Sequence, residues 1–312
     1  MGEYNRFSTQ GERKKVKKIT NTADGIKECD DRLSLRINEI AEDICKNSEI
    51  KLIRLIGPSC AGKTTAAKML AKRFSELGKR LHTVSLDDFF YDTNRLLAVS
   101  KSENGEQIDY DSPKTIDTAA LRTFVTEIFD NDRSHCPIFD FTVGKRIGFR
   151  EFLCTDDDIF LFEGIQALYP NVTEIFEELR HPSSTVYIAP LSSINIGGAV
   201  FEPNEIRLLR RIVRDRRFRN SEAEFTYFMW GGVRDNEEKN IFPYVTNCDY
   251  EIDSTMPYEI GILKPHLEKA FELVLPDSPN RERSDAILEK MKNVVSIPDS
   301  MILENSIYKE FV

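Results

Sequence analysis

The chain reads Gly57-Pro58-Ser59-Cys60-Ala61-Gly62-Lys63-Thr64, and this stretch decides its fold. Glycine, four residues and Gly-Lys-Thr is the pattern of a loop whose glycines permit a tight turn and whose backbone N–H groups point at phosphate oxygens. Lys63 can bridge the outer phosphates of a nucleotide, and the Thr64 hydroxyl can reach Mg²⁺. The pattern therefore predicts a nucleoside triphosphate site over residues 57–65, Thr65 included.

The residues on either side of this loop supply the setting that the motif requires. A short apolar run over residues 50–56 predicts a strand that enters the loop. Residues 64–74 are strong helix formers, and Gly78 marks the end of that helix. The start of the helix adds its positive dipole end to the phosphate site.

Further along the chain, strand patterns alternate with helix patterns. Strands are expected over 80–86, 159–162, 185–188 and 250–252. Helices are expected over 31–45, 112–129, 204–218, 257–273 and 283–293. This alternation predicts an α/β fold of the P-loop NTPase kind, a doubly wound and mainly parallel sheet with helices on both faces. Ligands of such sheets bind beyond the carboxyl ends of the strands.

Length and composition divide the chain into three parts and narrow the class of protein. Of its 312 residues we interpret 1–30 as a disordered basic tail, 31–275 as the nucleotide-binding domain and 276–312 as a C-terminal helical extension. The net charge of −9 argues against a nucleic-acid partner, although residues 13–18 form a basic cluster. No apolar run approaches a membrane span, and six scattered cysteines without metal-ligand spacing indicate a reducing, cytoplasmic location.

Acidic residues fall where predicted strands end. Glu163 follows the apolar strand 159–162 and is expected to hold Mg²⁺, directly or through water. Asp87 is expected to orient and deprotonate an attacking hydroxyl. The alternative for Glu163 is a solvated carboxylate at the start of a loop, and for Asp87 or Asp88 it is an N-cap.

Residues 207–219 contain seven arginines, several of them at helical spacing. Arg207, Arg210 or Arg211, and Arg214 share one helix face, and apolar residues occupy the other. This pattern predicts an Arg-rich helical lid whose guanidinium groups neutralise charge on a transferred phosphoryl group. A solvated helix face and a nucleic-acid patch remain the alternatives.

Several motifs in one order give the sequence a family resemblance over about residues 32–275. Besides GPSCAGKTT (57–65) they are SLDDFF (85–90), DYDSPKTID (109–117), PIFDF (137–141), FEGI (162–165) and RLLRRIVRD (207–215). The chain resembles the uridine kinase family of P-loop kinases, relatives of phosphoribulokinase. It is similar to the branch that carries threonyl-tRNA-synthetase-type N-terminal regions.

The resemblance implies roles for individual residues. In that family the residue matching Asp87 faces the nucleoside 5′-hydroxyl, and the residue matching Asp111 holds the ribose hydroxyls. Arg211 and Arg214 match lid arginines near the phosphates of substrate and ATP, and Arg219 extends that set. Glu163 matches the magnesium-associated acid. Asp111 also has a local interpretation, as a helix-start residue.

The positions that read the base differ from the family pattern. Where characterised uridine–cytidine kinases carry a hydroxylated aromatic residue and a histidine, this sequence has Phe139 and Gly144. Phe139 can stack on a base but cannot donate a hydrogen bond, and Gly144 has no side chain. Base specificity is therefore left open.

Three functional hypotheses follow. The first is an ATP- and Mg²⁺-dependent nucleoside 5′-kinase, with Lys63, Asp87, Arg211 and Arg214 as catalytic residues. The second is a phosphoribulokinase- or pantothenate-like kinase, for which Lys114, Lys145 and Arg146 are available to bind the substrate. The third is a non-catalytic ATP-binding regulatory or RNA-associated protein. Homo-oligomers are common in the family that the chain resembles, and the sequence itself gives no evidence for one.

Overall fold

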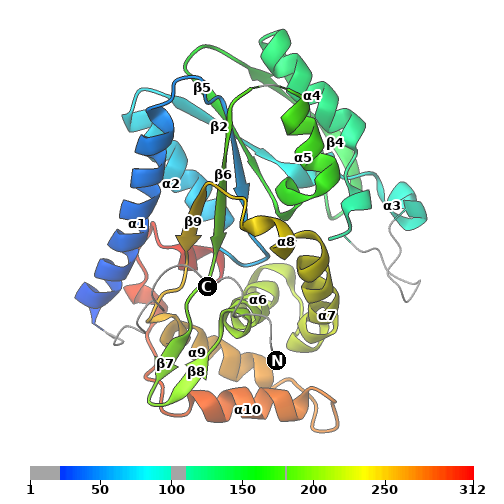
Figure 1. The fold of residues 1–312 in the computed structure, drawn as a ribbon. Coiled ribbons are helices and arrows are strands. Elements are labelled where there is room, and N and C mark those ends of the chain that lie inside the picture. The colour runs from blue at the N-terminus through cyan, green and yellow to red at the C-terminus, as the bar shows by residue number, and fades with distance from the viewer. Residues whose placement is uncertain (1–21, 100–109, 180) are drawn as a thin grey trace.

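A parallel sheet forms the centre of the protein in the computed structural model, which describes residues 22–99, 110–179 and 181–312. Among these residues its five strands run in the order β2-β5-β1-β6-β9 (Figure 1). They are β1 (Leu52–Ile56), β2 (Arg80–Ser85), β5 (Asp158–Glu163), β6 (Ser183–Ala189) and β9 (Tyr250–Asp253). Every residue of β1 is buried because the strand lies between two neighbours and under helices on both faces. The predicted fold class and strand positions are confirmed.

Two hydrophobic clusters cover the two faces of the sheet. The larger one contains side chains of α1 (Ala23–Cys45), α2 (Lys63–Glu76), α6 (Pro203–Arg219), α7 (Ala223–Asn240), α9 (Glu259–Phe271) and α10 (Arg281–Met291). The other contains side chains of α4 (Thr118–Asp130), α5 (Pro170–Glu178) and α8 (Phe242–Val245). Figure 1 shows α1 and α2 on one side of the sheet and α4 and α5 on the other.

Two antiparallel hairpins lie outside the central sheet. The longer one joins β3 (Arg133–Asp140) to β4 (Lys145–Leu153), with a bulge between Ile138 and Phe139. The shorter one joins β7 (Ile194–Ile196) to β8 (Ala199–Phe201). A short helix, α3 (Thr93–Val99), lies beside the turn of the longer hairpin. The sequence patterns did not predict these hairpins.

Several predicted boundaries require correction. The helix expected from residue 31 already begins at Ala23, and Cys29 and Asp30 are buried in it. The division at residue 30 therefore falls inside a helix, whereas the basic cluster at 13–18 lies outside the described residues. Ser112 does cap a helical start, but of the 3₁₀ turn η3 (Pro113–Thr115), and α4 begins later with Asp117 as its N-cap.

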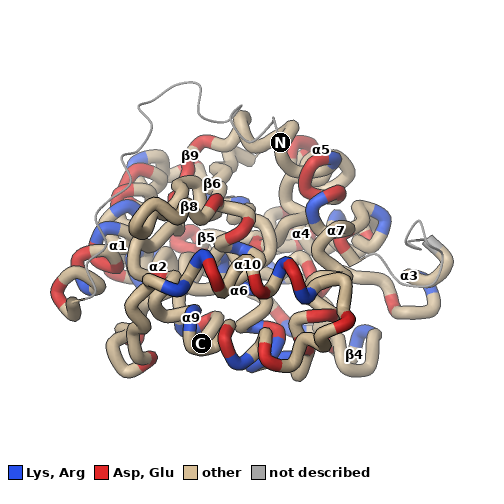
Figure 2. The backbone as a smooth tube through the Cα atoms, turned by 90° about the horizontal axis from the view of Figure 1, so that it is seen from below, with Lys and Arg blue, Asp and Glu red and all other residues tan. Residues whose placement is uncertain are grey.

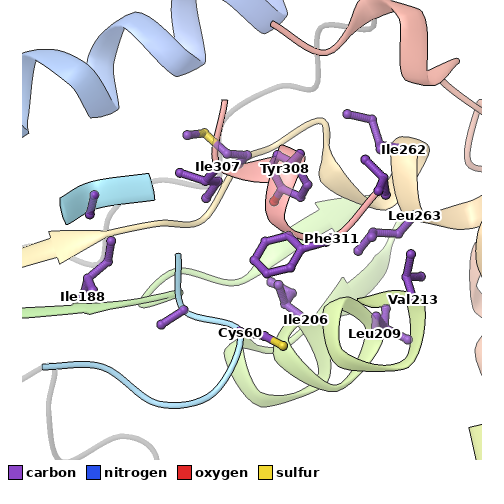
Figure 3. Close-up of a cluster of buried hydrophobic side chains, with 14 of the residues drawn as sticks. Cys60, Ile188, Ile206, Leu209, Val213, Ile262, Leu263, Ile307, Tyr308 and Phe311 are labelled. Atoms are coloured by element: carbon purple, nitrogen blue, oxygen red, sulfur yellow. The ribbon is translucent and has the colours of Figure 1, made fainter. Parts of the chain in front are cut away.

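The C-terminal region is part of the main core rather than an appendage. After α10 the chain forms the 3₁₀ turns η5 (Asp299–Met301) and η6 (Ile307–Glu310) and returns to the start of α2. Figure 3 shows Ile307, Tyr308 and Phe311 in one apolar cluster with Cys60 of the 57–65 loop. The expected division at residue 276 thus separates segments that share a core.

No helix in the described ranges combines the length and the apolar content that crossing a bilayer demands.

Candidate active site

The 57–65 loop joins the carboxyl end of β1 to α2, as the motif predicts. The Lys63 ammonium donates hydrogen bonds to the carbonyls of Gly57 (2.9 Å) and Pro58 (3.2 Å), so its charge lies over the loop. The side chain of Thr64 is exposed at the start of α2. The backbone N–H groups in the first turn of a helix lack partners within the helix, so the loop presents donors suited to phosphate.

Strand register brings the predicted acids to this loop. Glu163 ends β5 and is in register with Leu55 of β1 on one side and Ser85 of β2 on the other. Asp87 follows in the 3₁₀ turn η2 (Leu86–Phe89), immediately after β2. The loop, Glu163 and Asp87 therefore lie at the adjoining ends of three neighbouring strands.

Glu163 and Thr64 carry oxygen ligands of the kinds that Mg²⁺ binds. The Ser85 hydroxyl donates to Glu163 Oε1 at 3.2 Å, which orients the carboxylate. Burial raises the pKa of Glu163, and the positive charge of Lys63 opposes that rise. The described residues contain no cluster of three or more His, Cys, Asp or Glu side chains that could enclose a metal. A hydroxyl with one carboxylate suits Mg²⁺, because this ion keeps several waters.

Asp87 is held by a residue that the sequence analysis missed. Gln166, in the 3₁₀ turn η4 (Ile165–Leu168), donates from Nε2 to Asp87 Oδ1 at 2.7 Å. Burial raises the pKa of Asp87, whereas this hydrogen bond and the charge of Lys63 lower it. Gly164 makes room for the turn, because a Cβ there would lie 2.4 Å from Gln166 Oε1. The FEGI motif, with a glutamine directly behind it, was the available signal.

Asp88 has a separate role from Asp87. Its Oδ1 accepts a hydrogen bond from the Phe139 backbone N–H at 3.1 Å, and its Oδ2 lies 3.8 Å from Arg150. Asp88 therefore fixes the β3–β4 hairpin onto η2. The N-cap alternative is not observed for either acid, because Ser85 precedes this turn.

Two of the arginines assigned to a lid are buried structural residues instead. Arg207 forms an ion pair with Glu237 and donates to the Ser59 carbonyl at 3.1 Å. Arg210 pairs with Glu259 at 2.7 Å and donates to the Cys60 carbonyl at 3.2 Å. A buried guanidinium needs a carboxylate partner, and both arginines have one. On this side α6 is therefore part of the core, and its arginines support the loop through these carbonyl contacts. The lid interpretation was wrong for these two side chains.

The remaining arginines of the predicted set gather near the loop. Arg211, Arg214 and Arg219 lie 3.2, 2.6 and 3.6 Å from the carboxylate of Asp215. Arg214 also donates to the Ser59 hydroxyl at 3.4 Å. Because these guanidinium groups share one carboxylate, the cluster keeps an excess of positive charge beside the phosphate loop. Basic and acidic positions are otherwise interspersed over this side of the molecule (Figure 2).

The predicted acceptor residues differ in how accessible they are. Asp111 is half-buried, and its backbone carbonyl accepts a hydrogen bond from the Tyr169 hydroxyl at 2.5 Å. Phe139 is 7% exposed and packs edge-on against Phe90 and Phe141, with ring centroids 5.8 and 5.0 Å away. It therefore offers little surface on which a base could stack.

Gly144 and Arg146 both contact other parts of the chain closely. A Cβ at Gly144 would lie 2.0 Å from Thr93 Oγ1, so α3 fills the space that a side chain would need. Arg146 donates to the carbonyls of Phe89 and Phe90 and pairs with Asp117 at 3.0 Å. These contacts hold the β3–β4 hairpin against η2 and Asp117, and the expectation that Arg146 binds substrate stays a prediction.

Comparison with known proteins agrees with this geometry. The sequence profile of the Phosphoribulokinase / Uridine kinase family matches residues 52–259. A uridine kinase of Ureaplasma urealyticum is 27% identical over 179 residues, covering 57% of this chain and 75% of that protein. A uridine kinase of Mycoplasma genitalium is 25% identical over 241 residues, covering 76% and 90%.

A solved structure shows the same fold. The putative fructose transport system kinase from Silicibacter sp. TM1040 superposes with a TM-score of 0.51 at 16% identity, covering 69% of this chain and 98% of that one. The family profile matches two thirds of the chain, and the phosphate loop, Asp87 and Glu163 lie at adjoining strand ends. The chain therefore belongs to the phosphoribulokinase / uridine kinase family.

Proposed function

We propose that this kinase transfers the terminal phosphoryl group of ATP to the 5′-hydroxyl of a nucleoside, with Mg²⁺. The observation that carries the proposal is the position of Glu163 at the end of β5 and of Asp87 just after β2, near the end of β1 from which the loop with Lys63 starts. The similarity to uridine kinases of two organisms supports a nucleoside as acceptor. Phe139 and Gly144 leave the identity of the base open.

Each residue has a distinct task in this reaction. Bound ATP supplies the phosphoryl group, and Mg²⁺ offsets the charge on its phosphates. The loop N–H groups and Lys63 hold the phosphates, and Thr64 and Glu163 would hold the metal. Asp87 aligns the acceptor hydroxyl and takes its proton as that oxygen bonds to the terminal phosphorus. Gln166 positions Asp87 through its 2.7 Å hydrogen bond.

The arginine cluster and Asp111 complete the assignment. Arg211, Arg214 and Arg219 offset the negative charge that develops on the oxygen leaving with ADP. They can do so because the single carboxylate of Asp215 does not balance the charge of three guanidinium groups. Asp111 binds the ribose hydroxyls. A cytoplasmic location accompanies this proposal, and the six unpaired cysteines support it.

The test is ADP release with ATP and Mg²⁺ across ribonucleosides, pentose phosphates and pantothenate. A ribonucleoside should give the highest kcat/KM. A pentose phosphate or pantothenate as the best acceptor would replace the proposal by the second hypothesis. Nucleotide binding without ADP release for any acceptor would favour a non-catalytic protein.

The Asp87→Asn variant tests the mechanism. Turnover should fall by about 10²–10⁴-fold, the usual contribution of a general base, while ATP still binds. Asp157→Asn is the matched control, since Asp157 is exposed and pairs with Lys79 at the opposite end of the sheet. Near-normal turnover of the Asp87 variant would remove this residue from the mechanism.

A further inference from the structure

We propose that Glu310 competes with the phosphates of the nucleotide for the same backbone donor at the start of α2, and so restrains nucleotide binding. This inference rests on the proposed nucleotide site. It assigns a regulatory role to a carboxylate that lies 245 residues along the chain from the loop it contacts.

The contact is direct. The backbone N–H of Thr65 donates to Glu310 Oε1 at 2.5 Å. Thr65 is the third residue of α2, and the Ala66 N–H already bonds to the Gly62 carbonyl within the helix. The Thr65 N–H is therefore among the donors that a helix start offers to an anion, and Glu310 is the anion that accepts from it.

The carboxylate also lies among the charged groups of the site. The pKa of Glu163 is raised by burial, and the negative charge of Glu310 adds to that rise. The pKa of Arg214 is raised too, since the negative charges around it, Glu310 among them, outweigh its burial. Glu310 thus acts on both the proposed metal-binding acid and a proposed phosphate-binding arginine.

The backbone that carries Glu310 is anchored firmly. Ile307, Tyr308 and Phe311 are fully buried (Figure 3). The Ile307 side chain also packs against the loop, since a Cβ added to Gly62 would lie 3.6 Å from it. The Tyr308 hydroxyl accepts from Arg210 at 3.0 Å. The Ser306 hydroxyl donates to the buried carboxylate of Asp30 at 3.1 Å, before η6 begins.

Glu310 itself is half-buried. With its neighbours fixed in the core, the Glu310 side chain can rotate away while the turn stays in place. We therefore expect a side-chain switch rather than release of the whole segment.

The competition has a simple physical origin. One N–H cannot bond fully to a carboxylate and a phosphate oxygen, and the two anions repel at contact distance. Nucleotide binds only the molecules in which Glu310 has turned away, so the apparent affinity is the intrinsic affinity multiplied by the fraction of such molecules. Removing the charge of Glu310 should restore the intrinsic affinity.

The experiment measures the dissociation constant of Mg·ADP by calorimetry, without any acceptor. Glu310→Gln and Glu310→Ala should each bind about tenfold to a hundredfold more tightly than the wild type, as expected for loss of a charge-assisted contact. Glu304→Gln is the matched control, because Glu304 belongs to the same segment, is 95% exposed and should leave the constant unchanged. Inorganic tripolyphosphate should show the same gain, since the competition concerns phosphate alone.

Equal or weaker binding by both Glu310 variants would overturn the proposal. Should the variants not fold, a structure of the wild type with Mg·ADP decides it: Glu310 must have left Thr65 N, and a retained contact refutes the competition. Failure of the proposed function has a different signature. In that case no acceptor is phosphorylated, yet the gain in ADP affinity persists.

Discussion

Strand β5 begins and ends with a carboxylate, and the two ends have opposite chemistry. Asp158 at the start is fully buried and accepts hydrogen bonds from Arg80, His82 and Thr155. Although burial opposes it, these bonds lower the pKa of Asp158 to about 2. Glu163 at the end accepts from the Ser85 hydroxyl, and burial raises its pKa.

The difference separates Asp158, a carboxylate that stabilises the fold, from Glu163, a carboxylate that is available to bind a ligand. Asp158 has its hydrogen-bonding capacity filled by the protein, so its charge contributes to folding. Glu163 is left with unfilled capacity at a site that we assign to a cation, and the folded protein bears the cost of burying it. The two acidic residues at the ends of β5 are thus distinguished by their hydrogen-bond partners.

Among the changes that test this comparison of the two ends of β5, the largest effect is expected from Glu163→Gln. Removing this carboxylate should lower kcat by about 100-fold, the upper range for loss of a group that holds or orients a metal. The free energy of unfolding should stay equal or rise, since a costly buried charge disappears. Steady-state ADP release and urea unfolding measure the two quantities, and a loss of stability with unchanged kcat would reverse the comparison.

Asp158→Asn should produce the converse result. The variant loses the charge-assisted bonds from Arg80 and His82, which should lower the free energy of unfolding by about 2 kcal/mol, as a pKa shift of this size implies. Its kcat should remain within about twofold of the wild type, because residue 158 lies at the other end of the strand from the loop. A large fall in kcat at normal stability would contradict this separation.

The smallest effect concerns pH. The folded pKa of Asp158 is lowered from 3.8 to about 2, so its stabilisation is complete above about pH 4 and is lost as the pH falls toward 2. Glu163 has a raised folded pKa, so its contribution to stability is greatest in acid and declines as the pH rises through that pKa. Urea unfolding at several pH values should show wild type and Asp158→Asn converging near pH 2. If the difference between their free energies of unfolding did not change with pH, the stabilisation would have to come from groups other than the Asp158 carboxylate.

The sequence predicted those parts of the molecule that depend on local pattern. The loop motif and the apolar strands located β1, β5 and the carboxyl-end acids, because hydrophobic period and glycine spacing are local properties. Partners distant in sequence were not predictable. Arg207 and Arg210 looked like phosphate-binding residues, because their partners Glu237 and Glu259 lie 30 and 49 residues away.

The β3–β4 hairpin was missed for a related reason. Ile147 and Phe149 of β4 are exposed, so the strand does not alternate between a polar solvent face and an apolar core face. Gln166 had a weak signal in its place directly behind the FEGI motif, whereas no motif marks Glu310. The roles of both residues became clear from their contacts with Asp87 and Thr65.

Arg210 joins three parts of the chain that are synthesised far apart in time. It holds the Cys60 carbonyl, Glu259 and the Tyr308 hydroxyl together. A nascent polypeptide on the ribosome therefore cannot complete these contacts until the segment around Tyr308 has emerged. Such long sequence separations slow folding, so maturation of the nucleotide site should be a late event in biogenesis.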